Sequence, residues 1–369
     1  MFIWRLFILF TTQYFAKCCD SYSSFLQTTT FSDSFVEVKN YNNCMCVPYW
    51  QCKEDFSGLV EEDGSDILDI RVFRDNRKET DLSASCTGDF DVCCKVECGR
   101  LNNGLKYASP KFRILEGGGS VAEFAEFPWM LGLLQNRAYV CGASLIHPQV
   151  AITAAHCVSN LGKFKVRAGE WNWASNNEPI PHQDRFTKRI IIHPHYDPSS
   201  LRNDIAILIL DNPLKLTENV GVVCLPPYAK RMKTRRRCTA SGWGKNSHTV
   251  GTYQSTLKKV DLPIMPIENC LHSLRRARLG ASFNLHSSFI CAGGEMHKDT
   301  CKGDGGSPLI CPVNDDFDRY EQTGIVSWGL TCGIQNTPGV YVNVALFTDW
   351  IDEELNYYNF DTQIYKISE

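Results

Sequence analysis

The sequence lacks a long hydrophobic run and a strong excess of charge of either sign. Its 369 residues carry 38 Lys and Arg against 41 Asp and Glu, a formal net charge of −3, whereas a dedicated nucleic-acid-binding protein usually shows a strong basic excess. The basic run 230–237 is interpreted as a solvated loop, as most charge runs are. The apolar run 6–10 is far shorter than the roughly 20 residues of a membrane-spanning helix. Neither nucleic acid nor a membrane span is therefore expected.

The sequence also contains no internal repeat, no low-complexity tract and no Asn-x-Ser/Thr site with a permitted middle residue, so N-glycosylation is not expected. What it does contain is cysteine, 18 residues in all. Cysteines in such number are paired outside the cell and kept reduced in the cytosol. Arg5 precedes the apolar run 6–10, and 16–19 offer a cleavage point. This pattern predicts a signal peptide over residues 1–19 and a secreted, extracellular protein; the alternative is an N-terminal membrane anchor.

Cysteines and composition divide the remaining chain into three parts. Six cysteines lie in 44–94, a polar stretch with an acidic segment at 61–69 and too little apolar material for a large core, so disulfides must hold it together. Six cysteines alone permit fifteen connectivities. A polar connector follows over 95–113. From residue 114 onward, short β-branched runs between Gly and Pro turns predict an all-β sandwich or barrel, and 345–358 has the apolar spacing of a terminal helix.

Three segments of this last part carry candidate chemistry. His156 lies in Thr-Ala-Ala-His-Cys, and a histidine suits general-base work because its pKa is near neutral. Asp204 leads an apolar run, Asn-Asp-Ile-Ala-Ile-Leu, where a buried carboxylate can hold a histidine in one tautomer. The glycines of 299–309 let backbone N–H groups approach a developing oxyanion. Taken singly, the histidine reads as structural and the aspartate as a strand cap.

In this order the three segments resemble the chymotrypsin family of serine proteases. The resemblance runs over 114–358 and includes further motifs, which are Phe127-Pro128-Trp129, Cys141 to Ile146, Gly242-Trp243-Gly244, Ser327-Trp328-Gly329 and Pro338 to Tyr341. It implies two six-stranded antiparallel β-barrels with a C-terminal helix and a site in the cleft between the barrels. It also implies that His156 is the general base and that Asp204 orients it.

The third family motif is altered. The family pattern is Gly-Asp-Ser-Gly-Gly-Pro, and this chain reads Gly303-Asp304-Gly305-Gly306-Ser307-Pro308. Gly305 takes the nucleophile's place and has no side chain with which to form an acyl-enzyme. Ser307 lies two residues on, up to ~7 Å away in extended chain, whereas a nucleophile must lie about 3 Å from its base. We therefore expect no functional catalytic residue and a chain that is not an enzyme.

Two other functional features are implied by the resemblance. Asp299 matches the base of a trypsin-like specificity pocket, with Ser327, Trp328, Gly329 and Gly339 around it, and a buried carboxylate there would pair with Arg or Lys. The alternative is a relic pocket without a ligand. Cleavage between Arg113 and Ile114 is the candidate processing step. However, counting back from 127–129 puts Glu116 where the new terminus should pair with Asp304, so that pairing is in doubt.

The early cysteines, with their Cys-x-Cys pattern and the Cys93-Cys94 doublet, resemble the clip domain of arthropod serine proteases. The predicted domains are thus a clip domain at 44–94, a linker at 95–113 and a catalytically degenerate protease-like domain at 114–358. The disulfide pairs that these resemblances imply use every cysteine that remains after the predicted signal peptide 1–19 is removed. The implied disulfides are Cys44–Cys93, Cys46–Cys86, Cys52–Cys94, Cys98–Cys224, Cys141–Cys157, Cys238–Cys311, Cys270–Cys291 and Cys301–Cys332.

A clip domain with glycine at the nucleophile position resembles the non-catalytic clip-domain serine protease homologues of insects, which include cofactors of prophenoloxidase activation in haemolymph. The implied partners are an upstream clip protease and a prophenoloxidase-type zymogen or its activating protease. No cofactor is required, although Glu170, Asn172 and Glu178 lie where several family members bind calcium, and oxygen ligands suit calcium. The basic loop 71–78 is a processing or docking candidate or a plain exposed loop. An active trypsin-like protease and an adhesive or matrix protein remain the alternatives.

Overall fold

A computed structural model describes residues 44–48, 91–95, 97–101, 121–175, 177–230, 234–245, 251–313 and 316–367. All of them belong to one compact unit, Asn42–Glu369. The predicted signal peptide, the basic loop 71–78, the processing candidates Arg113 and Ile114, and Glu116 lie outside the described residues. No helix within the described ranges is long and apolar enough to cross a membrane.

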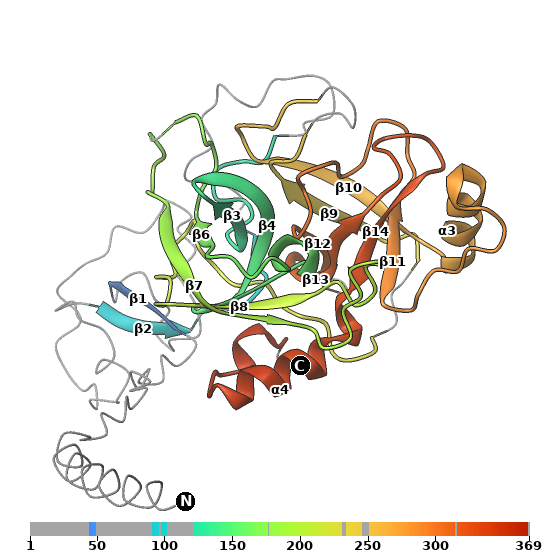
Figure 1. Ribbon diagram of the computed structural model, residues 1–369. Coiled ribbons are helices and arrows are strands. Elements are labelled where there is room, and N and C mark those ends of the chain that lie inside the picture. Colours follow the sequence, from blue (N-terminus) through green and yellow to red (C-terminus); the bar gives the residue numbers. More distant parts are fainter. Residues whose placement is uncertain are drawn as a thin grey trace, which may run out of the picture. The chain divides into compact units, whose positions relative to one another are not determined.

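The first barrel, green to yellow in Figure 1, is a closed sheet of six antiparallel strands in the order β3-β4-β5-β8-β7-β6. Side chains that point inward are apolar and buried, and β8 is buried along its whole length because it packs on both faces. The strands are β3 (Met130–Gln135), β4 (Ala138–His147), β5 (Val150–Thr153), β6 (Lys165–Ala168), β7 (Gln183–Ile192) and β8 (Ala206–Leu210).

The second barrel, orange to red in Figure 1, closes in the order β10-β11-β14-β13-β12-β9, again with antiparallel neighbours. The two closed barrels confirm the all-β prediction. The strands are β9 (Arg237–Gly242), β10 (Lys258–Met265), β11 (Phe289–Gly293), β12 (Pro308–Val313), β13 (Asp316–Trp328) and β14 (Pro338–Asn343). A further antiparallel pair, β1 (Cys44–Pro48) and β2 (Asp91–Lys95), lies in the cysteine-rich part of the chain.

Helices are few, and the predicted terminal helix is present. It is α4 (Thr348–Tyr357), which buries Ile351 and Leu355, one helical turn apart. The packed chain continues past residue 358, because Tyr365 is fully buried and its carbonyl accepts a hydrogen bond from the backbone N–H of Leu225. The other helical segments are α2 (Ala155–Val158), α3 (Ile267–Leu274), the π-helical η3 (Arg275–Leu279), and the 3₁₀ turns η4 (Val344–Leu346) and η5 (Gln363–Tyr365).

Five disulfides link the described side chains. Each constrains the unfolded chain and is expected to stabilise the fold, typically by roughly 2–4 kcal/mol and by more where the closed loop is long. The three bridges implied for 44–94 involve side chains outside the described ones. The five are Cys98–Cys224, Cys141–Cys157, Cys238–Cys311, Cys270–Cys291 and Cys301–Cys332.

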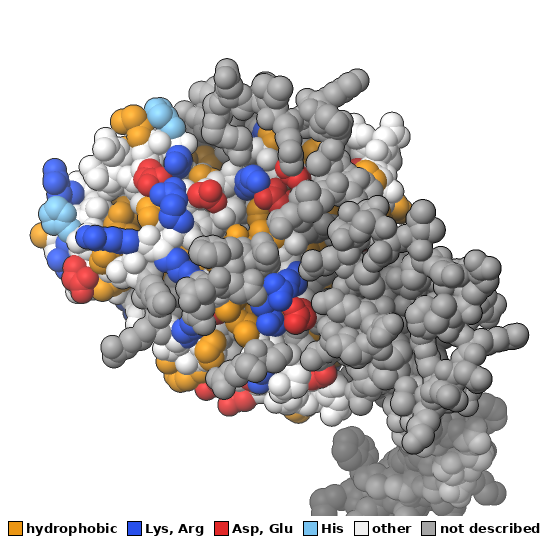
Figure 2. All heavy atoms as spheres, turned by 180° about the vertical axis from the view of Figure 1, so that it is seen from behind, with side chains coloured by type: hydrophobic (Ala, Val, Ile, Leu, Met, Phe, Trp, Pro, Cys, Tyr) orange, Lys and Arg blue, Asp and Glu red, His pale blue; other side chains and the backbone are white. Residues whose placement is uncertain are grey.

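The face drawn in Figure 2 carries Lys and Arg side chains next to Asp and Glu side chains, with hydrophobic side chains between them. Charges of both signs are mixed there, as the small net charge of the sequence predicts. Large fields of one sign steer charged polymers to a surface, and the described residues that are coloured on this face form none.

Candidate functional site

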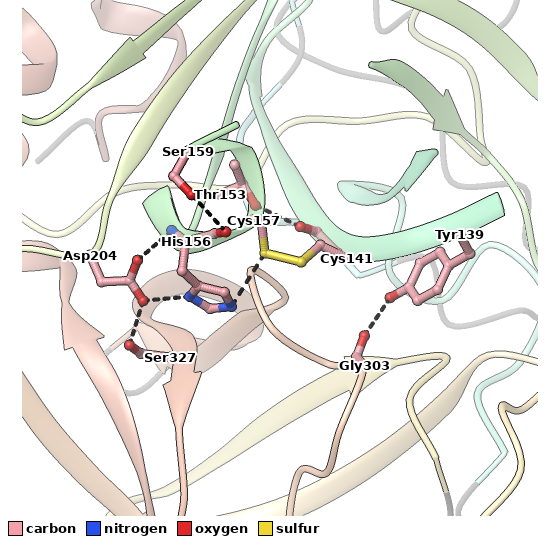
Figure 3. The surroundings of a disulfide bond; sticks show 10 residues. Tyr139, Cys141, Thr153, His156, Cys157, Ser159, Asp204, Gly303 and Ser327 are labelled. Carbon is pink, nitrogen blue, oxygen red and sulfur yellow. Dashed lines mark hydrogen bonds and ion pairs between the residues drawn. A yellow bond between two sulfur atoms is a disulfide. The ribbon is translucent and has the colours of Figure 1, made fainter. Parts of the chain in front are cut away.

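The centre of the candidate site is a hydrogen-bonded histidine and aspartate. His156 follows β5 on α2, and Asp204 precedes β8; because β5 and β8 are paired, both residues lie at the same end of the first barrel. His156 Nδ1 lies 2.7 Å from Asp204 Oδ2, and the His156 backbone N–H donates to Asp204 Oδ1 at 2.8 Å (Figure 3). The hydroxyl of Ser327, on β13 of the other barrel, also donates to Asp204 Oδ2, at 2.5 Å.

This arrangement fixes the imidazole. The Asp204 side chain is fully buried, whereas that of His156 is 30% exposed. A buried carboxylate that accepts a hydrogen bond from Nδ1 holds the ring in the tautomer whose Nε2 is unprotonated. Nε2 then points toward the glycine-rich loop, in the geometry of a general base.

The residue that faces Nε2 is Gly305. The backbone N–H of Gly142 donates to the Gly305 carbonyl at 2.8 Å, which places this loop beside β4. A Cβ at position 305 would lie only 2.8 Å from His156 Nε2 and 3.3 Å from its Cε1. The imidazole therefore occupies part of the space that a side chain would need. The base faces a residue with no group that can attack a carbonyl carbon.

The side chain of Ser307, two residues on, lies against the first barrel. It is fully buried, and a Cβ on Gly142 of β4 would lie 2.1 Å from Ser307 Oγ. The hydroxyl thus packs against the backbone of the first barrel. Ser307 is not among the residues that line the cavity beside His156, and its exclusion as a nucleophile stays a prediction.

A cavity of about 300 Å³ opens beside His156. Its walls are the loop 299–303, the strand end 326–329 and Gly339, and the Cys301–Cys332 disulfide closes one side. A Cβ on Gly339 would lie 3.2 Å from Asp299 Oδ1, so glycine at this position keeps the approach to the carboxylate open. Thr331 also lines the cavity, a residue that sequence reasoning missed because no family motif marks it.

Asp299 lines this cavity, and one oxygen of its carboxylate is unsatisfied. Its Oδ2 accepts a hydrogen bond from the backbone N–H of Gly333 at 3.2 Å, while its Oδ1 is buried without a hydrogen-bond partner. Burial raises the pKa of Asp299 to about 7, because the charged form loses its hydration. A cationic side chain entering the cavity would supply the missing partner.

The loop beside the cavity is held by a second buried carboxylate, Asp304. Its two oxygens accept hydrogen bonds from the backbone N–H groups of Gly244 and Cys301, both at 2.8 Å. Burial raises the pKa of Asp304 to about 6. The Tyr139 hydroxyl donates to the carbonyl of Gly303 at 3.0 Å (Figure 3). These contacts fix the glycine-rich loop.

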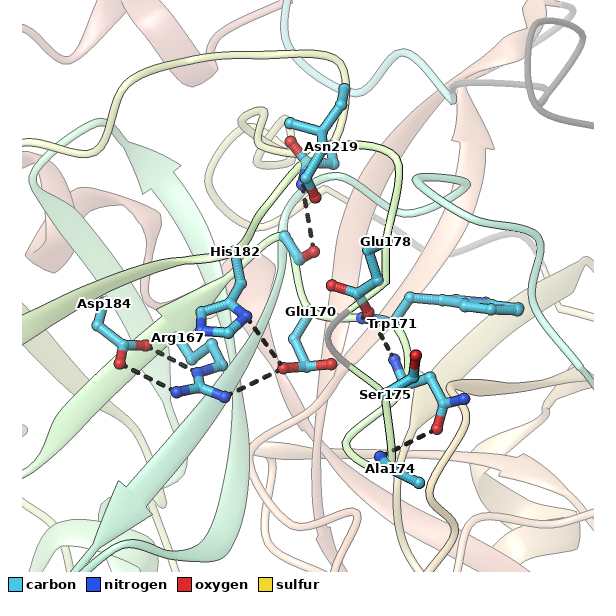
Figure 4. A network of polar contacts seen from close by, with 12 residues as sticks. Arg167, Glu170, Trp171, Ala174, Ser175, Glu178, His182, Asp184 and Asn219 are labelled. Atoms are coloured by element: carbon cyan, nitrogen blue, oxygen red, sulfur yellow. Dashed lines mark hydrogen bonds and ion pairs between the residues drawn. The ribbon is translucent and has the colours of Figure 1, made fainter.

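The predicted calcium ligands lie on one loop, but only two of them converge (Figure 4). The carboxylates of Glu170 and Glu178 lie close together, with His182 as a third member of the group. Asn172 instead turns its Oδ1 to the backbone N–H of Ala174, at 3.1 Å. Sequence reasoning missed His182, although its place four residues after Glu178 was a possible signal.

The negative charges of Glu170 and Glu178 are partly balanced by neighbouring groups of the same chain. Glu170 Oε2 accepts a hydrogen bond from Arg167 at 3.2 Å and lies 3.5 Å from His182 Nδ1. Glu178 Oε1 accepts two backbone N–H groups at 2.8 Å. Glu170 Oε1 is buried without a partner, and burial and the charge of Glu170 raise the pKa of Glu178. Two carboxylates with an unused oxygen are a donor set that fits a hard cation.

Known proteins with this organisation include several that are named as inactive. The Trypsin family model matches residues 116–351, and the serine protease Clip domain PPAF-2 model matches 33–95. Phenoloxidase-activating factor 2 of Galleria mellonella is 46% identical over 276 residues, which cover 71% of this chain and 89% of that protein. Inactive CLIP domain-containing serine protease A3 of Aedes aegypti is 38% identical over 342 residues, covering 88% and 70%.

A third relative, inactive CLIP domain-containing serine protease A8 of Anopheles gambiae, is 33% identical over 342 residues, covering 87% of this chain and 91% of that protein. Both domain models and the relatives agree with the two barrels, the cleft and the paired strands of the cysteine-rich part. The chain therefore belongs to the trypsin family and, within it, to the clip-domain serine protease homologues.

Proposed function

We propose that this protein is a secreted, non-catalytic binding cofactor of an extracellular proteolytic cascade that activates prophenoloxidase in haemolymph. One observation carries the proposal: a fixed His156–Asp204 pair and an open cavity face Gly305, which has no side chain. Loss of the serine of a triad costs on the order of 10⁶ in kcat. The names of the relatives support the cascade, since they include a phenoloxidase-activating factor and proteins called inactive.

The cavity is the binding site in this proposal. Asp299 offers a buried carboxylate oxygen without a partner, and glycine at 329 and 339 leaves room above it. A guanidinium or ammonium group that enters the cavity donates a charge-assisted hydrogen bond to this oxygen, and such a bond is stronger than one from a water molecule. The cofactor thus holds an Arg or Lys side chain of an upstream clip protease, of the zymogen or of its activating protease, and does not cut beside it. Processing between Arg113 and Ile114 precedes this role.

The test combines a covalent probe with a reversible one. The protein, intact and after processing, is treated with a biotinylated fluorophosphonate and titrated with fluorescent p-aminobenzamidine. The proposal expects no covalent labelling and saturable binding of the amidine. Stoichiometric labelling would identify an active protease, and absence of amidine binding would identify a relic pocket.

Calcium binding at Glu170 and Glu178 is a second part of the proposal. The unpartnered Oε1 of Glu170 supports it, as does the raised pKa of Glu178, because a carboxylate pair disfavours two negative charges without a cation. Arg167 and His182 already share the other oxygen of Glu170. The ion would therefore be a stabiliser of this loop, with no part in chemistry.

A further inference from the structure

The outer face of strands β6 and β7 is positively charged around one exposed aromatic ring. Along β6 the side chains alternate, so that Val166 and Ala168 are buried in the barrel while Lys165 and Arg167 face outward. Lys163, two residues before Lys165, is exposed, whereas Lys165 and Arg167 are half-buried. Three cations thus follow one another at every second residue.

The ring belongs to Phe186 of β7, which pairs directly with Lys165 of β6. Phe186 is 41% exposed, an unusual position for a large apolar side chain on a strand. The Lys163 ammonium lies 4.4 Å from the ring centroid and the Lys165 ammonium 5.7 Å from it. Both distances are within the range of a cation–π contact. Two cations therefore lie over the ring, and part of the ring remains open to solvent.

The local charge balance favours an anionic partner. Asp184 accepts hydrogen bonds from both Lys165, at 3.0 Å, and Arg167, at 2.8 Å, and this guanidinium also bonds Glu170. This face therefore has three cations, Lys163, Lys165 and Arg167, and two carboxylates that pair with them. Over residues 161–192 the sequence has six Lys and Arg against three Asp and Glu, although the whole chain is slightly acidic.

We propose that this face, defined as Lys163, Lys165, Arg167 and Phe186, binds an acidic, extended peptide segment of a protein partner that also carries an apolar side chain. Side chains on the same face of a strand repeat at about 6.6 Å, so carboxylates at alternate positions of the segment match the cations of β6. The apolar side chain covers the ring of Phe186. A sulfated polysaccharide would use the charges but would leave this ring exposed.

The proposal adds a second contact surface to the proposed binding role, away from the pocket. It is tested on the full-length protein with a fluorescein-labelled peptide in which Glu and Phe alternate with Thr, measured by fluorescence anisotropy. An exposed ion pair contributes up to about 1 kcal/mol, or about fivefold in Kd. Lys163→Glu replaces attraction by repulsion and should weaken binding by about tenfold. Phe186→Ser should weaken it by about fivefold.

Three controls make the result decisive. Arg276→Glu, on η3 of the other barrel, makes the same change in net charge and should leave the Kd unchanged. The Gln version of the peptide should bind at least tenfold more weakly. Raising the salt from 0.1 to 1 M shortens the Debye length from about 10 to about 3 Å and should abolish most of the binding. Equal melting temperatures show that the variants are folded.

Equal losses with Lys163→Glu and Arg276→Glu would overturn the proposal, because they would show a general charge effect. It would also be overturned if heparin bound tightly and bound equally well to Phe186→Ser, since the partner would then be a polyanion without an apolar contact. Amidine binding in the pocket should be unchanged in Lys163→Glu. Failure here is therefore distinguishable from failure of the proposed pocket function.

Discussion

Binding of a cationic ligand in the pocket should depend on pH through Asp299. The perturbation is a pH titration of p-aminobenzamidine binding from pH 5 to pH 9, a range in which the amidine stays charged. Burial raises the pKa of Asp299 to about 7, so the pocket holds a neutral acid at low pH and a carboxylate at high pH. Only the carboxylate pairs with the amidinium.

The magnitude follows from the fraction of ionised pocket. The apparent Kd equals the intrinsic Kd divided by the competent fraction. With the pKa of Asp299 at about 7, roughly 1% of the carboxyl is ionised at pH 5 and roughly 90% at pH 8. The affinity should therefore rise by about a hundredfold over these three pH units and then level off. An aspartate with an unperturbed pKa of about 3.9 would change the affinity less than twofold over the same range.

The assay needs one matched variant. Asp299→Asn keeps the size of the side chain and removes its charge, so it should bind the amidine weakly at every pH. A wild-type profile that is flat between pH 5 and pH 8, or has its midpoint near pH 4, would show that the carboxyl is hydrated and would refute the argument from burial. A midpoint near pH 7 in both wild type and Asp299→Asn would point to a different titrating group.

Other measurements test the remaining parts of the structure. The contribution of Asp299 to the free energy of unfolding in urea, taken as wild type minus Asp299→Asn, should be largest below about pH 4 and should be lost as the pH rises through about 7, because the folded state raises the pKa of Asp299 and so binds its proton more tightly than the unfolded chain; a difference that does not change with pH would contradict this. Gly305→Ser should become labelled by a fluorophosphonate after processing, provided that the imidazole moves away from the Cβ position. If the variant is still not labelled, the oxyanion loop is also unable to support the reaction. Replacing Cys98 and Cys224 together by Ser should lower the free energy of unfolding by roughly 4–5 kcal/mol, since the bridge spans 126 residues, and an unchanged urea midpoint would contradict this. Calcium should raise the melting temperature of the wild type and not of Glu170→Gln in calorimetry; an equal rise in both would place the ion elsewhere.

Much of the fold was predictable because the chain carries many short motifs in a fixed order. Each barrel closes over strands whose apolar runs end at Gly or Pro turns, and His156 and Asp204 stand where two paired strands meet the cleft. Counting from Cys301 to Pro308 without a gap put Gly305 at the nucleophile position, and in the structure a Cβ at 305 would lie 2.8 Å from His156 Nε2. These features depend on local sequence, so they can be predicted from one amino-acid sequence.

Other features depend on contacts between distant segments and gave no local signal. Tyr365 is buried, and its carbonyl accepts a hydrogen bond from the backbone N–H of Leu225, only after the chain has passed α4. The pKa of Asp299 is raised by burial that 299–303, 326–329 and Gly339 create together. The exposure of Phe186 between two lysines requires the β6–β7 register. Hydrophobic alternation alone would have placed such a ring in the core.

The intact His156–Asp204 pair is by itself no evidence of catalysis in this chain. Asp204 belongs to the first barrel, yet Ser327 of the second barrel donates to the same oxygen as His156 Nδ1. Removing one donor would leave a fully buried carboxylate short of a partner, at a cost of roughly 1–3 kcal/mol. The group is therefore required to join the two barrels at the cleft whether or not a serine faces it. A binding protein that needs a rigid pocket has the same physical reason to contain this pair as a protease has. In the proposed function it is position 305 that separates the two, because a Cβ there would lie 2.8 Å from His156 Nε2 and the residue is a glycine.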